Sequence, residues 1–227
     1  MELDEVLAEL RRAADPTRLT GMARYRIATD SALGVTVTEL RAIARWIGRD
    51  HALASALWDT RIHEARILAT IVDEPERVTE AQAESWVADV RSWDLCDGLC
   101  GNLLDRTPFA LDVAVEWSAR DEEFVRRAGF VLIATSAVHR KDLPDERFDV
   151  LLPTIRAGAT DDRNAVKKAV SWALRQIGKR SPGLHARAVA TAEEIRGIGS
   201  RPARWIASDV LRELRSDAVL RRLGPSG

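Results

Sequence analysis

The chain has 227 residues, of which 46% are hydrophobic and 30% charged, and its formal net charge is −1. These values are typical of a folded globular protein that can bury a sizeable core, and they exclude a disordered chain. The sequence contains no run of about 18 apolar residues, and its acidic amphipathic start lacks the pattern of a signal peptide. We therefore expect a cytoplasmic protein that makes no contact with a membrane.

Apolar residues recur at helical spacing along almost the whole chain. The expected helices lie near 3–15, 22–29, 36–47, 50–58, 62–72, 79–90, 92–104, 107–117, 121–138, 144–155, 165–178, 184–195, 202–214 and 218–223. The expected N-caps are Thr36 or Thr38, Asp50, Thr79 and Asp121. No window alternates between apolar and polar residues as a strand does, so the chain is predicted to be all-α.

Helices of about 10–17 residues joined by short loops can stack as antiparallel pairs. We predict a curved array of such pairs, which would offer a concave surface to an elongated partner. Residues 1–227 are expected to form a single domain, with a peripheral helix within 1–20 and a partly flexible tail at 216–227.

The small net charge hides an uneven distribution. From residue 163 onward, fourteen Lys and Arg stand against five Asp and Glu, whereas residues 1–162 carry 20 basic and 30 acidic groups. A polyanion responds to a local basic face rather than to the total charge, so nucleic acid is a candidate partner. The alternative is that the arginine-rich helices only solvate the surface.

The segment SWDLCD places Trp93 and Asp97 four residues apart, on one face of a helix. Leucines and cysteines form the buried side of that helix, so Asp97 lies beside apolar surface, where a carboxylate needs a partner or a chemical task. In the alternative reading, Trp93 is a core residue and Asp97 a solvated or salt-bridged acid.

The segment 165–182 is a basic helix that carries Trp172. Lys168 lies four residues before Trp172, whereas Arg175 and Lys179 lie three and seven residues after it. Arg180 follows Lys179 directly. An indole surrounded by cations suits contact with phosphates and sugars. The alternative is a half-buried indole with basic side chains at its edge.

Two adjacent arginines, Arg126 and Arg127, diverge by about 100° on their helix, so at least one should reach solvent or a phosphate. The four histidines are dispersed, and Cys96 and Cys100 offer only two ligands where a structural zinc needs four. We therefore expect no metal and no cofactor.

Six short blocks carry a resemblance to a known family. They are MARY at 22–25, LW at 57–58, HEARILA at 63–69, SWDLCD at 92–97, RRAGF at 126–130 and KKAVSWALRQIGKRSP at 167–182. Together they resemble the AlkD-like DNA alkylation-repair family, which is built of HEAT-like helical repeats. The resemblance covers roughly residues 20–215 and implies a right-handed HEAT-like α-solenoid.

The resemblance implies a monofunctional DNA glycosylase that excises cationic N3- or N7-alkylated purines from double-stranded DNA. The essential aspartate and the two tryptophans of the family fall on Asp97, Trp93 and Trp172. The implied DNA-binding residues are Arg127, Lys168, Arg175, Lys179, Arg180 and Tyr25. Ser92 stands where the family often has a further tryptophan, which marks a departure from its pattern.

In the mechanism that the resemblance implies, the charged purine leaves as a neutral base and Asp97 stabilises the oxocarbenium-like sugar. The protein is expected to act as a monomer and to be associated with the nucleoid when it acts on DNA. Two alternatives stay open: a helical-repeat protein that binds DNA without excising a base, and a scaffold for protein interactions.

Overall fold

Helices account for all the regular secondary structure in the part of the chain that the computed structural model describes, residues 2–25, 27 and 29–224. The prediction of an all-α chain is confirmed. The chain divides into two compact units, Met1–Thr107 and Pro108–Gly227, where the sequence led us to expect one domain. That both units act as one domain stays a prediction, and each unit is described on its own.

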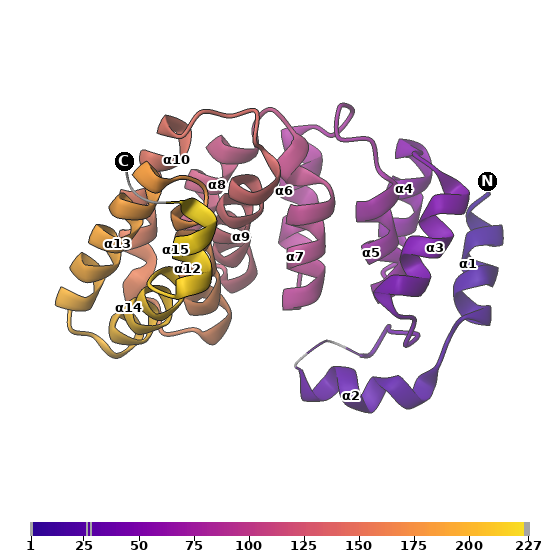
Figure 1. Ribbon diagram of the computed structural model, residues 1–227. Coiled ribbons are helices and arrows are strands. Elements are labelled where there is room, and N and C mark those ends of the chain that lie inside the picture. Colours follow the sequence, from indigo (N-terminus) through magenta and orange to yellow (C-terminus); the bar gives the residue numbers. More distant parts are fainter. Residues whose placement is uncertain (1, 26, 28, 225–227) are drawn as a thin grey trace. The chain divides into compact units, whose positions relative to one another are not determined.

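The first unit contains seven α-helices and two 3₁₀ helices among its described residues (Figure 1). In chain order they are α1 (Leu3–Arg12), η1 (Pro16–Arg18), α2 (Leu19–Arg24), α3 (Val37–Ile47), α4 (His51–Asp59), α5 (His63–Val72), α6 (Glu80–Asp89), α7 (Trp93–Asn102) and η2 (Leu104–Arg106). The helix expected near 22–29 ends earlier, at Arg24, and positions 26 and 28 lie outside the described residues.

Helix α5 lies at the centre of the first unit, because it packs against α1, α3, α4 and α7. Eight of its ten residues are buried. Among them, Glu64 accepts backbone hydrogen bonds from Leu33 and Gly34 at 2.8 and 2.7 Å, and so ties the preceding loop to the helix. Arg66 pairs with Asp89 of α6 at 2.8 Å. The HEARILA block is therefore structural.

The second unit contains α8 (Ala110–Ser118), α9 (Glu123–His139), α10 (Glu146–Asp149), α11 (Leu152–Ala157), η3 (Gly158–Thr160), α12 (Asn164–Gly178), α13 (Pro182–Gly197), α14 (Arg201–Leu214) and α15 (Asp217–Leu223). Helix α12 packs against α9, α13 and α14, and α8 packs against α9. The approach of α8 and α9 is close enough to need Gly129, since a Cβ there would lie 2.5 Å from the backbone nitrogen of Ser118.

Helix starts follow the expected caps at most positions. The side chains of Asp50 and Thr79 each accept a hydrogen bond from a backbone N–H of the first turn, as predicted, and of the two candidates Thr36 and Thr38 it is Thr36 that caps α3 in the same way. Helix α9 begins at Glu123, after Glu122 rather than Asp121. The helix expected over 144–155 is split into α10 and α11, because Pro153 lacks the N–H that a continuous helix would use.

None of the helices in the described part of the chain is both long and apolar enough to cross a membrane.

Candidate functional site

The predicted site residues divide between the two units. Trp93, Asp97 and Tyr25 belong to the first unit, and the remaining residues, Arg127, Lys168, Trp172, Arg175, Lys179 and Arg180, belong to the second. The two groups are considered separately.

Helix α7 presents one buried and one accessible side. The buried side consists of Leu95, Cys96, Leu99 and Cys100. Both cysteines are fully buried, as expected from their place on the apolar side of the helix. Trp93 and Asp97 lie on the other side of the helix, where Trp93 is 39% exposed and Asp97 is half-buried. The alternative that makes Trp93 a core residue is therefore wrong.

The indole of Trp93 is held by a hydrogen bond from its Nε1 to the backbone oxygen of Tyr25, at 2.8 Å. Tyr25 is the C-cap of α2 and is itself 72% exposed. The contact joins the end of α2 to the first residue of α7 and leaves both aromatic side chains accessible. The MARY and SWDLCD blocks, 68 residues apart, thus meet in the first unit.

Asp97 is close enough to the cysteines to affect them. Burial raises the pKa of the Cys100 thiol well above its usual value, and the neighbouring Cys96 and the negative charge of Asp97 raise it further. The thiol therefore stays protonated at neutral pH and behaves as a core group.

Two polar contacts fix the orientation of α7 on α5. His63 Nε2 lies 2.8 Å from Asp94 Oδ2 in the first turn of α7, and Asn102 at its end donates to Thr70 Oγ1 at 3.0 Å. Burial opposes ionisation of Asp94, but the hydrogen bond and charge of His63 and the hydrogen bonds from Ser92 and Leu95 outweigh it, so its pKa is lowered. Asp94 positions α7, whereas Asp97 remains on the accessible side.

In the second unit, Arg127 is a buried structural residue rather than a surface cation. Its side chain extends toward α12, where Nη1 donates to the backbone oxygen of Ala165 at 2.6 Å, and only 6% of the residue is exposed. Arg126 is the more accessible of the pair and lies 3.4 Å from Asp161. The expectation that at least one of the two arginines reaches solvent therefore holds for Arg126.

Trp172 is half-buried on α12. With the Gln176 amide oriented to accept, Trp172 Nε1 lies 2.9 Å from its side-chain oxygen. Lys168, four residues before Trp172, is exposed. This arrangement fits a tryptophan at the edge of the core with one accessible cation one turn away.

The other cations of α12 are paired with carboxylates of α14. Arg175 and Lys179 both hydrogen bond to Glu213, Lys179 at 2.5 Å, and Arg175 also lies 3.5 Å from Asp209. Burial opposes ionisation of Glu213, but these two hydrogen bonds outweigh it and lower its pKa. Phosphates would have to compete with Glu213 for these cations.

Arg180 is enclosed by the loop that precedes α10. It lies 3.0 Å from Asp145, donates to the backbone oxygens of Ala137 and Leu143, and its guanidinium stacks over Phe148 at 4.2 Å. Only 6% of its side chain is exposed. These contacts stabilise the turn between α12 and α13.

The sequence reading did not find His63, Asp94, Asp209 or Glu213 as partners. Each pair joins helices that are far apart in the chain, and no local spacing signals it. Within the described residues, no group of three or more His, Cys, Asp or Glu side chains is arranged to hold a metal ion.

Comparisons with known proteins bear on both units. The family model for DNA alkylation repair enzymes matches residues 6–216. Among solved structures, the chain is similar to one from a family described as related to the HEAT-like repeat DNA glycosylases, with affinity for branched DNA structures. The TM-score is 0.77 and the identity 23%, covering 86% of this chain and 83% of that one. At this identity the likeness shows the fold alone, and it confirms HEAT-like helical repeats. No curated protein matches the chain.

Proposed function

Because the chain belongs to the DNA alkylation repair enzyme family, as the resemblance predicted, we propose that it is a monofunctional DNA N-glycosylase. Its substrate would be duplex DNA that carries a cationic alkylated purine, such as 3-methyladenine or 7-methylguanine. The observation that supports this proposal best is the pair on α7, the half-buried carboxylate of Asp97 one turn from the half-exposed indole of Trp93.

The two residue types suit the reaction. An alkylated purine already carries a positive charge, so it can leave as a neutral base with the electrons of the glycosidic bond and without a general acid. Positive charge then develops on the deoxyribose. The Asp97 carboxylate would stabilise this charge and accept a proton from the water that adds to the sugar, leaving an abasic site.

The indole of Trp93 would lie against the sugar and attract the cationic centre through its π-electrons, a contribution of about 0.5–2 kcal/mol. Its hydrogen bond to Tyr25 supports this role, because it fixes the ring while a face stays accessible. Trp172, Lys168 and the other predicted residues of the second unit are retained as proposed DNA contacts, of which Lys168 is the most exposed.

The test is release of 7-methylguanine from a duplex with one such lesion, under single-turnover conditions. We expect wild-type protein to release the base, and Asp97→Asn to slow release by about 10²–10³-fold. Asp112→Asn, at an exposed carboxylate of α8, is the matched control and should retain wild-type activity. No release by wild type, or equal rates for wild type and Asp97→Asn, would rule the proposal out.

A second candidate is a DNA-binding protein that does not excise bases, favoured by the similarity to a family with affinity for branched DNA. It predicts tighter binding to a four-way junction than to a duplex of equal length, together with no base release. Measuring both affinities and the release of 7-methylguanine with the same protein preparation separates the two candidates.

A further inference from the structure

An open hollow of about 290 Å³ lies between α3 and the end of α5 in the first unit. Its lining consists of Arg41, Ala44, Arg45, Gly48, Arg49 and Ile71. Three of these six residues are arginines and none is acidic. The charged side chains that line the hollow are therefore all cationic.

The small residues keep the hollow open. Arg41 and Arg45 lie one turn apart on α3, with Ala44 between them, and Gly48 ends the helix. Gly48 has a φ of +79°, a conformation that favours glycine, and a Cβ there would meet no atom within 4 Å. Three arginines thus line a space that no side chain fills.

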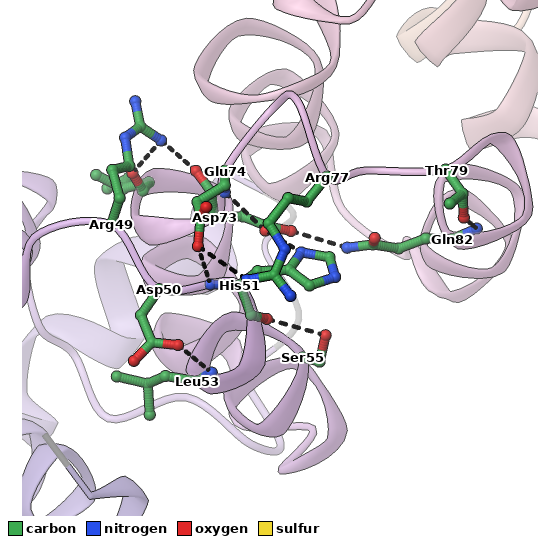
Figure 2. Close-up of polar contacts among 11 residues, drawn as sticks. Arg49, Asp50, His51, Leu53, Ser55, Asp73, Glu74, Arg77, Thr79 and Gln82 are labelled. Atoms are coloured by element: carbon green, nitrogen blue, oxygen red, sulfur yellow. Dashed lines mark hydrogen bonds and ion pairs between the residues drawn. The ribbon is translucent and has the colours of Figure 1, made fainter.

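Arg49 is held in place by backbone atoms. Its Nη1 donates to the backbone oxygens of Ile71, at 3.0 Å, and of Asp73, just beyond α5 (Figure 2). These acceptors are uncharged peptide groups, so Arg49 keeps its full positive charge while its position is fixed.

Asp50, the carboxylate next to Arg49 in the sequence, accepts a hydrogen bond from the backbone N–H of Leu53, and the two carboxylates that follow α5 also have other partners. Asp73 is fully buried, with His51 Nδ1 2.7 Å and Gln82 Nε2 2.8 Å from its oxygens (Figure 2). Glu74 accepts from the backbone of His51 at 3.1 Å and lies 3.3 Å from Arg77. These acids therefore anchor the helices around them.

Arg41 and Arg45 are exposed, and within the described part of the chain no carboxylate lies within ion-pair distance of either. The carbonyl groups at the end of α3 carry about half a negative charge, which three guanidinium groups exceed. The hollow is thus a region of net positive charge in a unit whose sequence is mainly acidic.

We propose that this hollow binds phosphates of a DNA strand, as a contact additional to the site around Asp97. Guanidinium groups bind phosphate oxygens through paired hydrogen bonds. Trp46 follows Arg45 on α3 and does not line the hollow, but it is 64% exposed, and an indole beside a phosphate site can stack on a sugar or base, which favours a nucleic acid over free phosphate. The proposal takes its partner, DNA, from the proposed function.

The hollow is separate from the Trp93 site. It contacts α5 at Ile71, whereas His63, which holds α7 through Asp94, is the first residue of α5. His63 and Ile71 are eight positions apart on α5, or about 12 Å along the helix axis.

The experiment measures binding of an undamaged 30-base-pair duplex by full-length protein. The double variant Arg41→Ala/Arg45→Ala should bind roughly tenfold more weakly at low salt, and the slope of log K against log salt should fall by about 1.8. The matched control, Arg11→Ala/Arg12→Ala, removes two exposed arginines from α1 of the same unit and should change affinity far less. Equal losses in the two double variants would overturn the proposal, as would no loss in either.

Two further measurements distinguish DNA phosphate from inorganic phosphate as the ligand of the hollow. Trp46→Ala should weaken duplex binding, while inorganic phosphate alone at millimolar concentration should leave the protein's melting temperature unchanged. A phosphate-induced rise that disappears in Arg41→Ala/Arg45→Ala, with duplex affinity unaltered, would assign the hollow to a small anion and contradict the proposal. The duplex in this binding experiment carries no lesion, so its result does not depend on whether the protein releases a base. Weaker duplex binding by Arg41→Ala/Arg45→Ala would therefore support the hollow even if the glycosylase proposal failed.

Discussion

His63 Nε2 lies 2.8 Å from Asp94 Oδ2, and this contact joins the first residue of α5 to the first turn of α7. Asp94 immediately follows Trp93 and precedes Asp97 by three residues. Because Asp94 is turned by about 100° from Trp93 around the helix axis, it can bind α5 while Trp93, and Asp97 one turn beyond Trp93, stay accessible. The pair therefore sets the rotation of α7 about its axis and, with it, the direction of the proposed catalytic carboxylate.

Removing this pair should cost stability. His63 is 5% exposed and Asp94 loses its partner in His63→Ala, so we expect the free energy of unfolding to fall by about 1–3 kcal/mol. Urea unfolding followed by circular dichroism measures the change. The Glu116→Ala variant, at an exposed position of α8, serves as a control and should unfold like wild type.

The contribution of Asp94 to the free energy of unfolding should depend on pH. Its pKa in the folded protein lies below the usual value of 3.8, so folding favours its ionised form. The stabilisation is therefore complete well above pH 4 and is lost as the pH falls through the folded pKa. The stability difference between wild type and Asp94→Asn should shrink from pH 6 to pH 3. A difference that stays constant over this range would contradict the assignment.

Trp93 should contribute to base release more than to folding. Since the indole is half-exposed, Trp93→Ala should slow release of 7-methylguanine by about 2–30-fold, the range that corresponds to 0.5–2 kcal/mol. Trp93→Phe keeps an aromatic face but loses the hydrogen bond to Tyr25 and should fall between wild type and Trp93→Ala. If Trp93→Phe is as slow as Trp93→Ala, the N–H rather than the ring is the important group.

Local sequence features predict the helices well, because capping and periodicity act over a few residues. Thr36 and Thr79 begin helices as expected, and the four-residue spacing of Trp93 and Asp97 correctly places them on one side of α7. The environment of the basic residues was not predictable in the same way. Glu213 meets Lys179 across 34 positions of the chain, so its effect on that cation depends on how α12 and α14 pack.

Arg127 illustrates the same limit. Helical geometry shows that Arg126 and Arg127 diverge, but it does not show which of the two faces α12. Arg127 donates a hydrogen bond to the backbone oxygen of Ala165. The arginine that the resemblance assigns to DNA is therefore the buried member of the pair. Its role in DNA binding stays a prediction.

The two kinds of cation on α12 should respond differently to substitution. Lys168 is exposed, so Lys168→Ala should weaken duplex binding and lower the salt slope by about 0.9. Glu213→Gln should instead strengthen binding, because it removes the carboxylate that engages Arg175 and Lys179. Glu116→Gln, at an exposed position of α8, controls for the loss of one negative charge. Weaker binding by Glu213→Gln would mean that these cations serve the packing of α12 on α14 and not DNA.

Gly129 should be intolerant of a side chain because of how closely α8 and α9 approach. A Cβ at this position would lie 2.5 Å from the nitrogen of Ser118 and 2.7 Å from the oxygen of Ala114, and neither backbone atom can move without shifting α8. We expect Gly129→Ala to lower the free energy of unfolding by about 1–3 kcal/mol, as overpacked cores do. Gly183→Ala, in the first turn of α13, is the matched control: its Cβ would meet no atom within 4 Å, so the variant should be as stable as wild type or up to about 1 kcal/mol more stable. Urea unfolding of both variants checks the pair, and equal stability of the two would mean that α8 and α9 are less closely packed than the structure shows.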